Sequence, residues 1–269
     1  MVYAPERPVI LDDILRSKRA ELAAARSSIS ESNLCEREGY DEPRRGFLHA
    51  LREGPRPRII AEIKRRSPSR GVIRKRFDPA AHARDYDAAG ASCISVLTDG
   101  PFFGGELAHL ETARRACSRP LLRKDFTIDP YQIVEARAWG ADAVLLIVAA
   151  LERGLLEELL ACAYAEGVDA LVEVHDRAEL DTAIAIGADL VGINNRDLTT
   201  FVTTVDVTRA LAPAAPIGVT LVSESGLGNA AELAELESLP GRGVDAFLIG
   251  ETFMAAPDPG EALTALLRG

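Results

Sequence analysis

A short motif recurs along the chain: a glycine, a small or branched residue, one further residue, and then an apolar run. A glycine at this point can end the preceding helix, because it adopts the left-handed backbone conformation without strain. The runs are four to six residues long, rich in Val, Ile and Leu, and alternate little. Such runs are typical of strands buried on both faces of a parallel sheet. The motif predicts five helix-to-strand junctions, at Gly90, Gly140, Gly167, Gly187 and Gly243.

Three more apolar runs lack the glycine and bring the expected number of strands to eight. The predicted strands are Ile59–Lys64, Cys93–Thr98, Leu121–Phe126, Ala143–Val148, Ala170–Val174, Leu190–Asn194, Thr220–Ser225 and Ala246–Gly250. Apolar residues at helical spacing predict helices between them. These helices are Pro79–Ala89, Leu107–Ala116, Pro130–Trp139, Leu151–Ala165, Ala178–Ile186, Ala230–Leu236 and Glu261–Leu267, with a shorter, weaker pattern at Asp206–Leu211.

Eight strands that each precede a helix, within about 210 residues, are the pattern of a (β/α)₈ or TIM barrel. An open doubly wound sheet is the alternative, but no G-x-G-x-x-G motif follows the first predicted strand. We therefore expect an α/β chain in one domain, with residues 1–50 as a helical extension and 51–269 as a catalytic barrel. Ile10, Ile14 and Leu22 have helical spacing within the extension, for which a solvated tail is the alternative.

Composition narrows the class of protein. Acidic residues outnumber basic ones by 41 to 31, and the net charge of −10 disfavours nucleic acid as a partner. No apolar run approaches the ~18 residues of a membrane span. The start, MVYAPERPVILDDIL, lacks the basic flank and apolar core of a secretion signal. The four cysteines are too widely spaced for a disulfide framework or a zinc site. We therefore expect a cytoplasmic enzyme without a metal ion.

Polar side chains interrupt the predicted strands near their carboxyl ends, which is where a barrel carries its chemistry. Alternate residues of a strand share a face, and a buried charge costs several kcal/mol unless it is paired. The residues concerned are Glu62 and Lys64 on the first strand, Lys124 on the third, Glu173 on the fifth, Asn194 and the following Arg196 on the sixth, and Glu224 on the seventh.

Each of these residues also has a purely structural interpretation. Glu62 and Lys64 could form a structural ion pair, Lys124 could extend past Phe126 to water, and Asn194 could hold its loop. Together they favour acid–base catalysis, because a ring of lysines and glutamates has little structural purpose. The four histidines show no ligand spacing, and we assign them no role.

Three loops rich in Gly and Ser suggest a phosphate site, although each string alone is also typical of an ordinary turn. Barrels often bind phosphate with the loops after strands seven and eight, where glycine lets backbone N–H groups approach an anion. Here those loops are Ser225–Asn229 and Gly250–Thr252, and Ser67–Gly71 follows the first strand beside several arginines. These three loops are the candidate phosphate site.

Six segments of the sequence resemble those of indole-3-glycerol phosphate synthase, and the resemblance covers nearly the whole chain, including the N-terminal ILDDIL segment. They are IAEIKRRSPSRG (Ile60–Gly71), SVLTDGPFFGG (Ser95–Gly105), PLLRKDFTIDPYQI (Pro120–Ile133), VGINNRDL (Val191–Leu198), VSESGL (Val222–Leu227) and FLIGETFM (Phe247–Met254).

The resemblance implies closure of a pyrrole ring on 1-(2-carboxyphenylamino)-1-deoxyribulose 5-phosphate, with loss of CO₂ and water and without cofactor or metal. It implies that Lys124 is the general acid and that Lys64 pairs with the substrate carboxylate. Glu62 and Glu173 fall on acid–base positions, supported by Asn194, Arg196 and Glu224. The resemblance also places Ser67, Ser225, Gly226, Gly250 and Glu251 on phosphate-binding positions. The residues that it implies would line the aromatic-ring pocket are Phe103, Phe126, Leu145 and Leu198.

The sequence departs from the family pattern at Glu251, where some members have Ser, and at Glu106, where a small polar residue is frequent. A carboxylate facing a phosphate would repel it, so we expect the Glu251 side chain to turn away while its N–H binds. Neither departure touches the proposed catalytic set.

Two kinds of alternative remain. One is a sibling phosphate-binding barrel, such as phosphoribosylanthranilate isomerase or tryptophan synthase α, and the other is a catalytically silent binding protein. Glu62 and Lys64, together with Lys124, argue against the sibling barrel. The intact acid–base set argues against the silent protein, which has no need to retain buried charges. We also expect a monofunctional enzyme, because little sequence follows the last strand, and a monomer or weak homo-oligomer whose partner is the small phosphorylated substrate.

Overall fold

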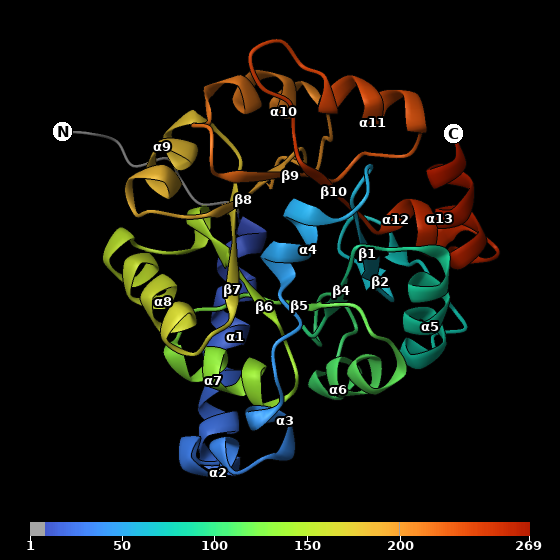
Figure 1. The fold of residues 1–269 in the computed structure, drawn as a ribbon. Helices are drawn as coiled ribbons and strands as arrows, with labels where there is room; N and C mark the ends of the chain where they lie inside the picture. Colours follow the sequence, from blue (N-terminus) through green and yellow to red (C-terminus); the bar gives the residue numbers. More distant parts are fainter. Residues whose placement is uncertain (1–8, 199) are drawn as a thin grey trace.

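The computed structural model describes residues 9–198 and 200–269 and has a closed barrel of eight parallel strands at its centre. Figure 1 shows the barrel end-on, with helices around the ring of strands. The strands follow one another around the barrel in chain order, and β1 closes it by pairing with the last strand, Ile59 against Phe247. They are β1 (Ile59–Ile63), β4 (Cys93–Leu97), β5 (Leu121–Lys124), β6 (Ala143–Ile147), β7 (Asp169–Val174), β8 (Leu190–Asn194), β9 (Thr220–Glu224) and β10 (Ala246–Ile249). The predicted (β/α)₈ fold is confirmed.

All eight predicted strands are found, and several end one or two residues earlier than predicted. The third ends at Lys124 rather than Phe126. The reason is local, because the Phe126 amide donates to the side chain of Asp125 at 2.8 Å and not to a neighbouring strand. This early turn leaves the Lys124 side chain at the mouth of the barrel.

The helices between the strands lie close to their predicted ranges, and five begin with an Asp or Asn that accepts a backbone N–H, as expected of helix N-caps. They are α5 (Pro79–Ala89), α6 (Leu107–Ala116), α7 (Pro130–Ala138), α8 (Arg153–Ala165), α9 (Arg177–Ala185), α10 (Asp206–Leu211), α11 (Ala230–Glu237) and α13 (Pro259–Arg268). Periodicity does not predict the shortest elements, namely the hairpin of β2 (Arg66–Ser67) and β3 (Gly71–Val72), helix α12 (Glu251–Ala255) and two 3₁₀ turns at Val148–Ala150 and Ala212–Ala214.

The segment before the barrel is helical, as predicted, although its first eight residues lie outside the described residues. It comprises α1 (Val9–Ser28), α2 (Glu31–Cys35), α3 (Glu38–Asp41) and α4 (Phe47–Glu53). In Figure 1, α4 lies in front of the ring of strands and α1 passes behind β6 and β7. The segment therefore contacts both ends of the barrel.

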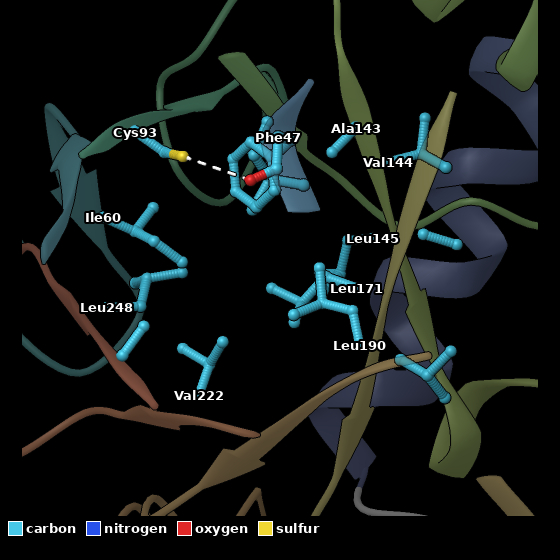
Figure 2. Packing of buried hydrophobic residues seen from close by; sticks show 14 of the residues in the cluster. Phe47, Ile60, Cys93, Ala143, Val144, Leu145, Leu171, Leu190, Val222 and Leu248 are labelled. Carbon is cyan, nitrogen blue, oxygen red and sulfur yellow. Dashed lines mark hydrogen bonds between the residues drawn. The ribbon is translucent and has the colours of Figure 1, made fainter. Parts of the chain in front are cut away.

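The barrel interior and the strand–helix layer form one large apolar cluster, part of which Figure 2 shows. Phe47 of α4 is fully buried in it, and the Cys93 thiol, at the start of β4, donates to the Phe47 carbonyl at 3.7 Å. Leu11 and Leu15 of α1 belong to the same cluster. Within the described ranges, no helix is both long enough and apolar enough to cross a membrane.

Candidate active site

A cavity of about 640 Å³ lies at the carboxyl ends of the barrel strands. This size is typical of pockets for small-molecule ligands. The cavity is lined by residues from all eight barrel strands and from the loops that follow them. Fifteen of the sixteen predicted site residues line it: Glu62, Lys64, Phe103, Lys124, Phe126, Leu145, Glu173, Asn194, Arg196, Leu198, Glu224, Ser225, Gly226, Gly250 and Glu251.

Lys124 lies at the centre of the polar floor of the cavity. Its Nζ is 3.0 Å from Glu173 Oε2 and 3.3 Å from Glu224 Oε2. All three side chains are largely buried, so water screens their interactions weakly. Lys124 therefore holds its proton within reach of both carboxylates and of the cavity.

The two carboxylates beside Lys124 differ in acidity. Burial acts to raise the pKa of Glu173, but Lys124, His175 and Asn194 outweigh it and hold that pKa well below its usual range. Burial raises the pKa of Glu224 to about 7, and Lys124 offsets this only in part while the charge of Glu173 adds to it. Burial lowers the pKa of Lys124, yet Glu173, Glu224 and Glu62 more than reverse that effect. At neutral pH the site therefore holds a charged lysine, an ionised Glu173 and a Glu224 near half protonation.

The second predicted lysine also has a carboxylate partner. Lys64, which follows β1, forms an ion pair with Glu62, and both side chains are mostly buried. The backbone of Gly250 lies against the Glu62 side chain, and a Cβ at Gly250 would collide with the Glu62 carboxylate. Glycine therefore provides the space in which this pair sits at the cavity wall.

Asn194 and Arg196 link the floor of the cavity to its rim. Asn194 Nδ2 donates to Glu173 Oε1 at 3.1 Å, and the Arg196 amide donates to Asn194 Oδ1 at 3.1 Å. Asn194 therefore orients the carboxylate that contacts Lys124. The Arg196 guanidinium extends to the rim, where its Nε donates to Thr203 Oγ1.

The loops after β9 and β10 form one side of the rim. Ser225 and Gly226 both have positive φ angles, 68° and 77°, and for Ser225 this conformation carries strain. A Cβ at Gly226 would crowd Thr203 at 2.6 Å, so the turn needs glycine. Because Gly226 carries no side chain, the backbone N–H groups of this turn can come close to an anion.

Glu251 does not stand alone at this rim. Its carboxylate is 2.8 Å from Arg70 Nη2 and 3.3 Å from Arg196 Nη2, so two guanidinium groups balance its charge. Ser67 is the one predicted residue that does not line the cavity. It is buried, its hydroxyl accepts from the Arg70 amide at 3.3 Å, and its neighbours Pro68, Ser69 and Arg70 face the cavity instead.

Apolar side chains form another part of the cavity wall, which we call the apolar wall. The rings of Phe103 and Phe126 lie with their centroids 6.3 Å apart, and Leu145 and Leu198 complete the predicted set. Ile10, Leu11 and Ile14 of α1 extend this wall, which the sequence analysis does not anticipate.

His175, to which the sequence analysis gives no role, lies directly behind Glu173. Its Nε2 is 3.3 Å from Glu173 Oε1 and its Nδ1 is 3.0 Å from Glu179 Oε2. Burial lowers the pKa of His175, but these two carboxylates reverse the effect and raise the pKa to about 10. A charged imidazolium therefore supports the ionised state of Glu173.

The fold and the cavity together define an acid–base enzyme built on a (β/α)₈ barrel, with a Gly- and Ser-rich rim beside buried lysine–glutamate contacts. A family model described as indole-3-glycerol phosphate synthase matches residues 11–266. The chain therefore belongs to the indole-3-glycerol phosphate synthase family.

Two curated relatives agree with this family. The chain is 48% identical over 261 residues to the indole-3-glycerol phosphate synthase of Burkholderia vietnamiensis, covering 96% of this chain and 98% of the relative. It is 48% identical over 265 residues to the enzyme of the same name from Rhizorhabdus wittichii, with the same coverage. The chain is accordingly a carboxy-lyase of tryptophan biosynthesis, which converts 1-(2-carboxyphenylamino)-1-deoxyribulose 5-phosphate to indole-3-glycerol phosphate, CO₂ and water.

Solved structures at low sequence identity share the fold. The KGPDC structure from Streptococcus mutans matches with a TM-score of 0.59 at 13% identity, over 79% of this chain and 96% of that one. Thiamine phosphate pyrophosphorylase from Pyrococcus furiosus matches with a TM-score of 0.57 at 18% identity, over 78% and 94%. These similarities concern the barrel alone.

Proposed function

We propose that the cavity holds the substrate in one orientation, with its ketone at Lys124. The phosphate lies at the rim formed by Ser225, Gly226, Gly250 and the Glu251 amide, and the carboxyphenyl ring lies against Phe103, Phe126, Leu145 and Leu198. The observation that carries this proposal is the contact of Lys124 Nζ with both Glu173 and Glu224 on the cavity floor. A buried ammonium between two carboxylates is charged and oriented toward the cavity, and a neighbouring protonated carboxyl can reprotonate it.

Ring closure is the first step. The ring carbon that carries the carboxylate forms a bond to the ketone carbon, and the developing negative charge on the ketone oxygen takes a proton from Lys124. Glu173 stays ionised and, with Asn194, orients the ammonium. Glu224, whose pKa is about 7, can return a proton to Lys124 after the transfer.

The later steps use the pair on the other side of the floor. Lys64 balances the charge of the substrate carboxylate until CO₂ leaves, and the electron pair of the broken bond returns to the ring and restores its aromaticity. The new hydroxyl then leaves as water with a proton from Lys64, while Glu62 takes the proton from the adjacent carbon. The pair of Lys64 and Glu62 is placed for this exchange because the two groups already contact each other.

The substrate phosphate, when bound at the rim, and the Glu251 carboxylate can both contact Arg70 and Arg196. Arg70 and Arg196 hold Glu251 in the free enzyme, and we propose that they turn toward the phosphate when it binds. Ser67 contributes indirectly, because its hydroxyl accepts the backbone N–H of Arg70 and so helps to hold the loop that carries Arg70.

We further propose a monomer or weak homo-oligomer that acts as one domain in the cytoplasm, with residues 1–50 as its extension and 51–269 as its barrel. The shared apolar cluster of Leu11, Leu15 and the barrel strands supports the single domain. The net charge of −10 supports the absence of nucleic acid from its partners.

The variant Lys124→Ala tests the proposed acid. Removal of a general acid is expected to lower kcat by roughly 10² or more, while KM changes far less because the phosphate and ring contacts remain. Formation of indole fluorescence from the purified protein and substrate measures both constants. Lys75→Ala, at an exposed lysine outside the cavity, is the matched control and should match the wild type. Near-normal turnover by Lys124→Ala would remove Lys124 from the mechanism.

A further inference from the structure

One lysine of the N-terminal segment is buried although no catalytic role requires it. Lys18 of α1 is 3% exposed. Its Nζ lies 2.8 Å from Asp125 Oδ1, 3.2 Å from Asp99 Oδ2 and 2.6 Å from Glu21 Oε2. Asp99 and Asp125 are themselves buried and belong to two different loops at the barrel mouth. One ammonium group therefore joins α1 to both loops.

Asp99 holds the loop that follows β4. Its Oδ1 accepts the backbone N–H of Phe102 at 2.9 Å and that of Phe103 at 3.2 Å, which fixes the turn that carries the Phe103 ring. Its other carboxylate oxygen faces Lys18. Loss of the contact with Lys18 would therefore affect the position of Phe103 through the Asp99 side chain alone.

Asp125 holds the loop that follows β5 in the same way. Its Oδ1 accepts the Phe126 amide at 2.8 Å and contacts Lys18, and its Oδ2 accepts from Thr98 Oγ1 at 2.5 Å. Asp125 also follows Lys124 directly in the chain. The two phenylalanines of the apolar wall are thus each set by an aspartate, and both aspartates contact the same ammonium.

The ammonium is required because the carboxylates are buried. Two buried anions that face a shared position repel each other, and loss of one partner from a buried ion pair is strongly destabilising. Burial raises the pKa of Asp99, and Lys18 partly counteracts the effect. Arg123 also balances Asp125, with its Nη2 at 3.4 Å from Asp125 Oδ2, but among the described residues no arginine forms an ion pair with Asp99. Without Lys18, Asp99 would lose the one ion pair that it forms within that part of the chain.

We propose that Lys18 is a positioning residue for the ring-binding wall: by holding Asp99 and Asp125 it sets the spacing of Phe103 and Phe126, and so the affinity for the aromatic end of the substrate. This inference rests on the proposed function for the location of the ring. It gives the N-terminal helix a part in substrate specificity in addition to its packing on the barrel.

The test compares Lys18→Met, which keeps the length of the side chain without its charge, with the wild type. KM for the carboxyphenylamino substrate is expected to rise at least tenfold, because the two loops separate. The inhibition constant of inorganic phosphate is expected to stay within twofold, because the anion rim does not contact Lys18. Leu22→Ala is the matched control on the same helix: it packs on the neighbouring cluster at α7, so it should lower Tm without changing KM.

A second variant separates charge from packing and guards against failure of the first to fold. Lys18→Met combined with Asp99→Asn removes one charge of each sign and keeps an oxygen for the Phe102 and Phe103 amides. KM of this double variant is expected to recover to between that of Lys18→Met and that of the wild type, remaining at least threefold above the wild type.

A wild-type KM in either folded variant, or an equal weakening of phosphate and substrate, would overturn the positioning role. Failure of the wild-type protein itself to convert the substrate would instead overturn the proposed function. The two failures are therefore distinguishable.

Discussion

Glu173 and Glu224 contact the same lysine, yet their surroundings give them opposite acidities. Glu173 also faces the imidazolium of His175 and the amide of Asn194, and these groups favour its anion. In the described part of the chain, Glu224 has only Lys124 as an ion-pair partner, and its Oε1 has no hydrogen-bond partner. Two chemically identical side chains thus take different roles: Glu173 orients the acid and Glu224 can exchange a proton near neutrality.

This difference predicts a pH-dependent stability. The pKa of Glu224 is about 7 in the folded protein and near its ordinary 4.5 when unfolded. The folded state then keeps a proton that the unfolded state has lost. The contribution of Glu224 to stability is therefore fully present below about pH 4.5 and is lost as pH rises through 7. The change is on the order of 3 kcal/mol.

Urea unfolding at pH 5 and pH 8 measures this effect when the wild type is compared with Glu224→Gln, whose amide does not titrate. The wild type should lose stability relative to the variant on going from pH 5 to pH 8. An identical difference between the two proteins at both pH values would show that Glu224 titrates normally.

At the scale of the elements, a glycine on a strand or directly after one makes room for a catalytic side chain from a neighbouring strand. Gly192 lies in β8, and a Cβ there would collide with the Glu224 carboxylate of β9 and crowd Leu171 at 3.2 Å. Gly250 has the same relation to Glu62. The carboxylates can extend across the barrel mouth only because these two positions carry no side chain.

Gly192→Ala should therefore damage catalysis more than folding. The methyl group displaces Glu224 from Lys124, and we expect kcat to fall by about tenfold or more, with a smaller fractional change in KM. Steady-state kinetics and a thermal melt of the same sample check both parts. Gly154→Ala, at an exposed helix position where a Cβ meets nothing within 4 Å, is the control and should keep wild-type activity. Wild-type kcat in Gly192→Ala would show that the position of Glu224 is unimportant.

The sequence of the N-terminal helix also indicates a buried ion pair, which the spacing of its apolar residues alone does not show. Ile10, Ile14 and Leu22 share a helical face, and Lys18 lies four residues from both Ile14 and Leu22 on that same face. A charged residue within an apolar stripe indicates a buried partner, because an unpaired buried charge is costly. The stripe alone could not say that the partners are Asp99 and Asp125, which come from distant strands.

At the scale of the whole molecule, the fold was predictable because most strands and helices have a signal in their own local sequence. Apolar runs and their flanking glycines predict the eight strands to within one or two residues. The common location of Lys64, Lys124 and Glu173 follows from the barrel, since parallel strands end at one mouth.

What could not be predicted depends on contacts between distant elements. His175 shows no motif, and its position behind Glu173 becomes meaningful only once Glu179 of the next helix is placed beside it. Ser67 lies in a Ser-rich loop as expected, but the hairpin of β2 and β3 turns its neighbours, and not Ser67, toward the cavity. Loop conformation over a few residues is not encoded in hydrophobic periodicity.

A crystal structure of the protein with the alcohol analogue of its substrate tests the proposed substrate orientation most directly. In this analogue the ketone is reduced to a hydroxyl. The new hydroxyl should lie about 3 Å from Lys124 Nζ. The phosphate should lie against the backbone of Gly226 and Gly250, and the ring between Phe103 and Phe126. An analogue bound with its phosphate or ring elsewhere, or with its hydroxyl out of reach of Lys124, would contradict the mechanism.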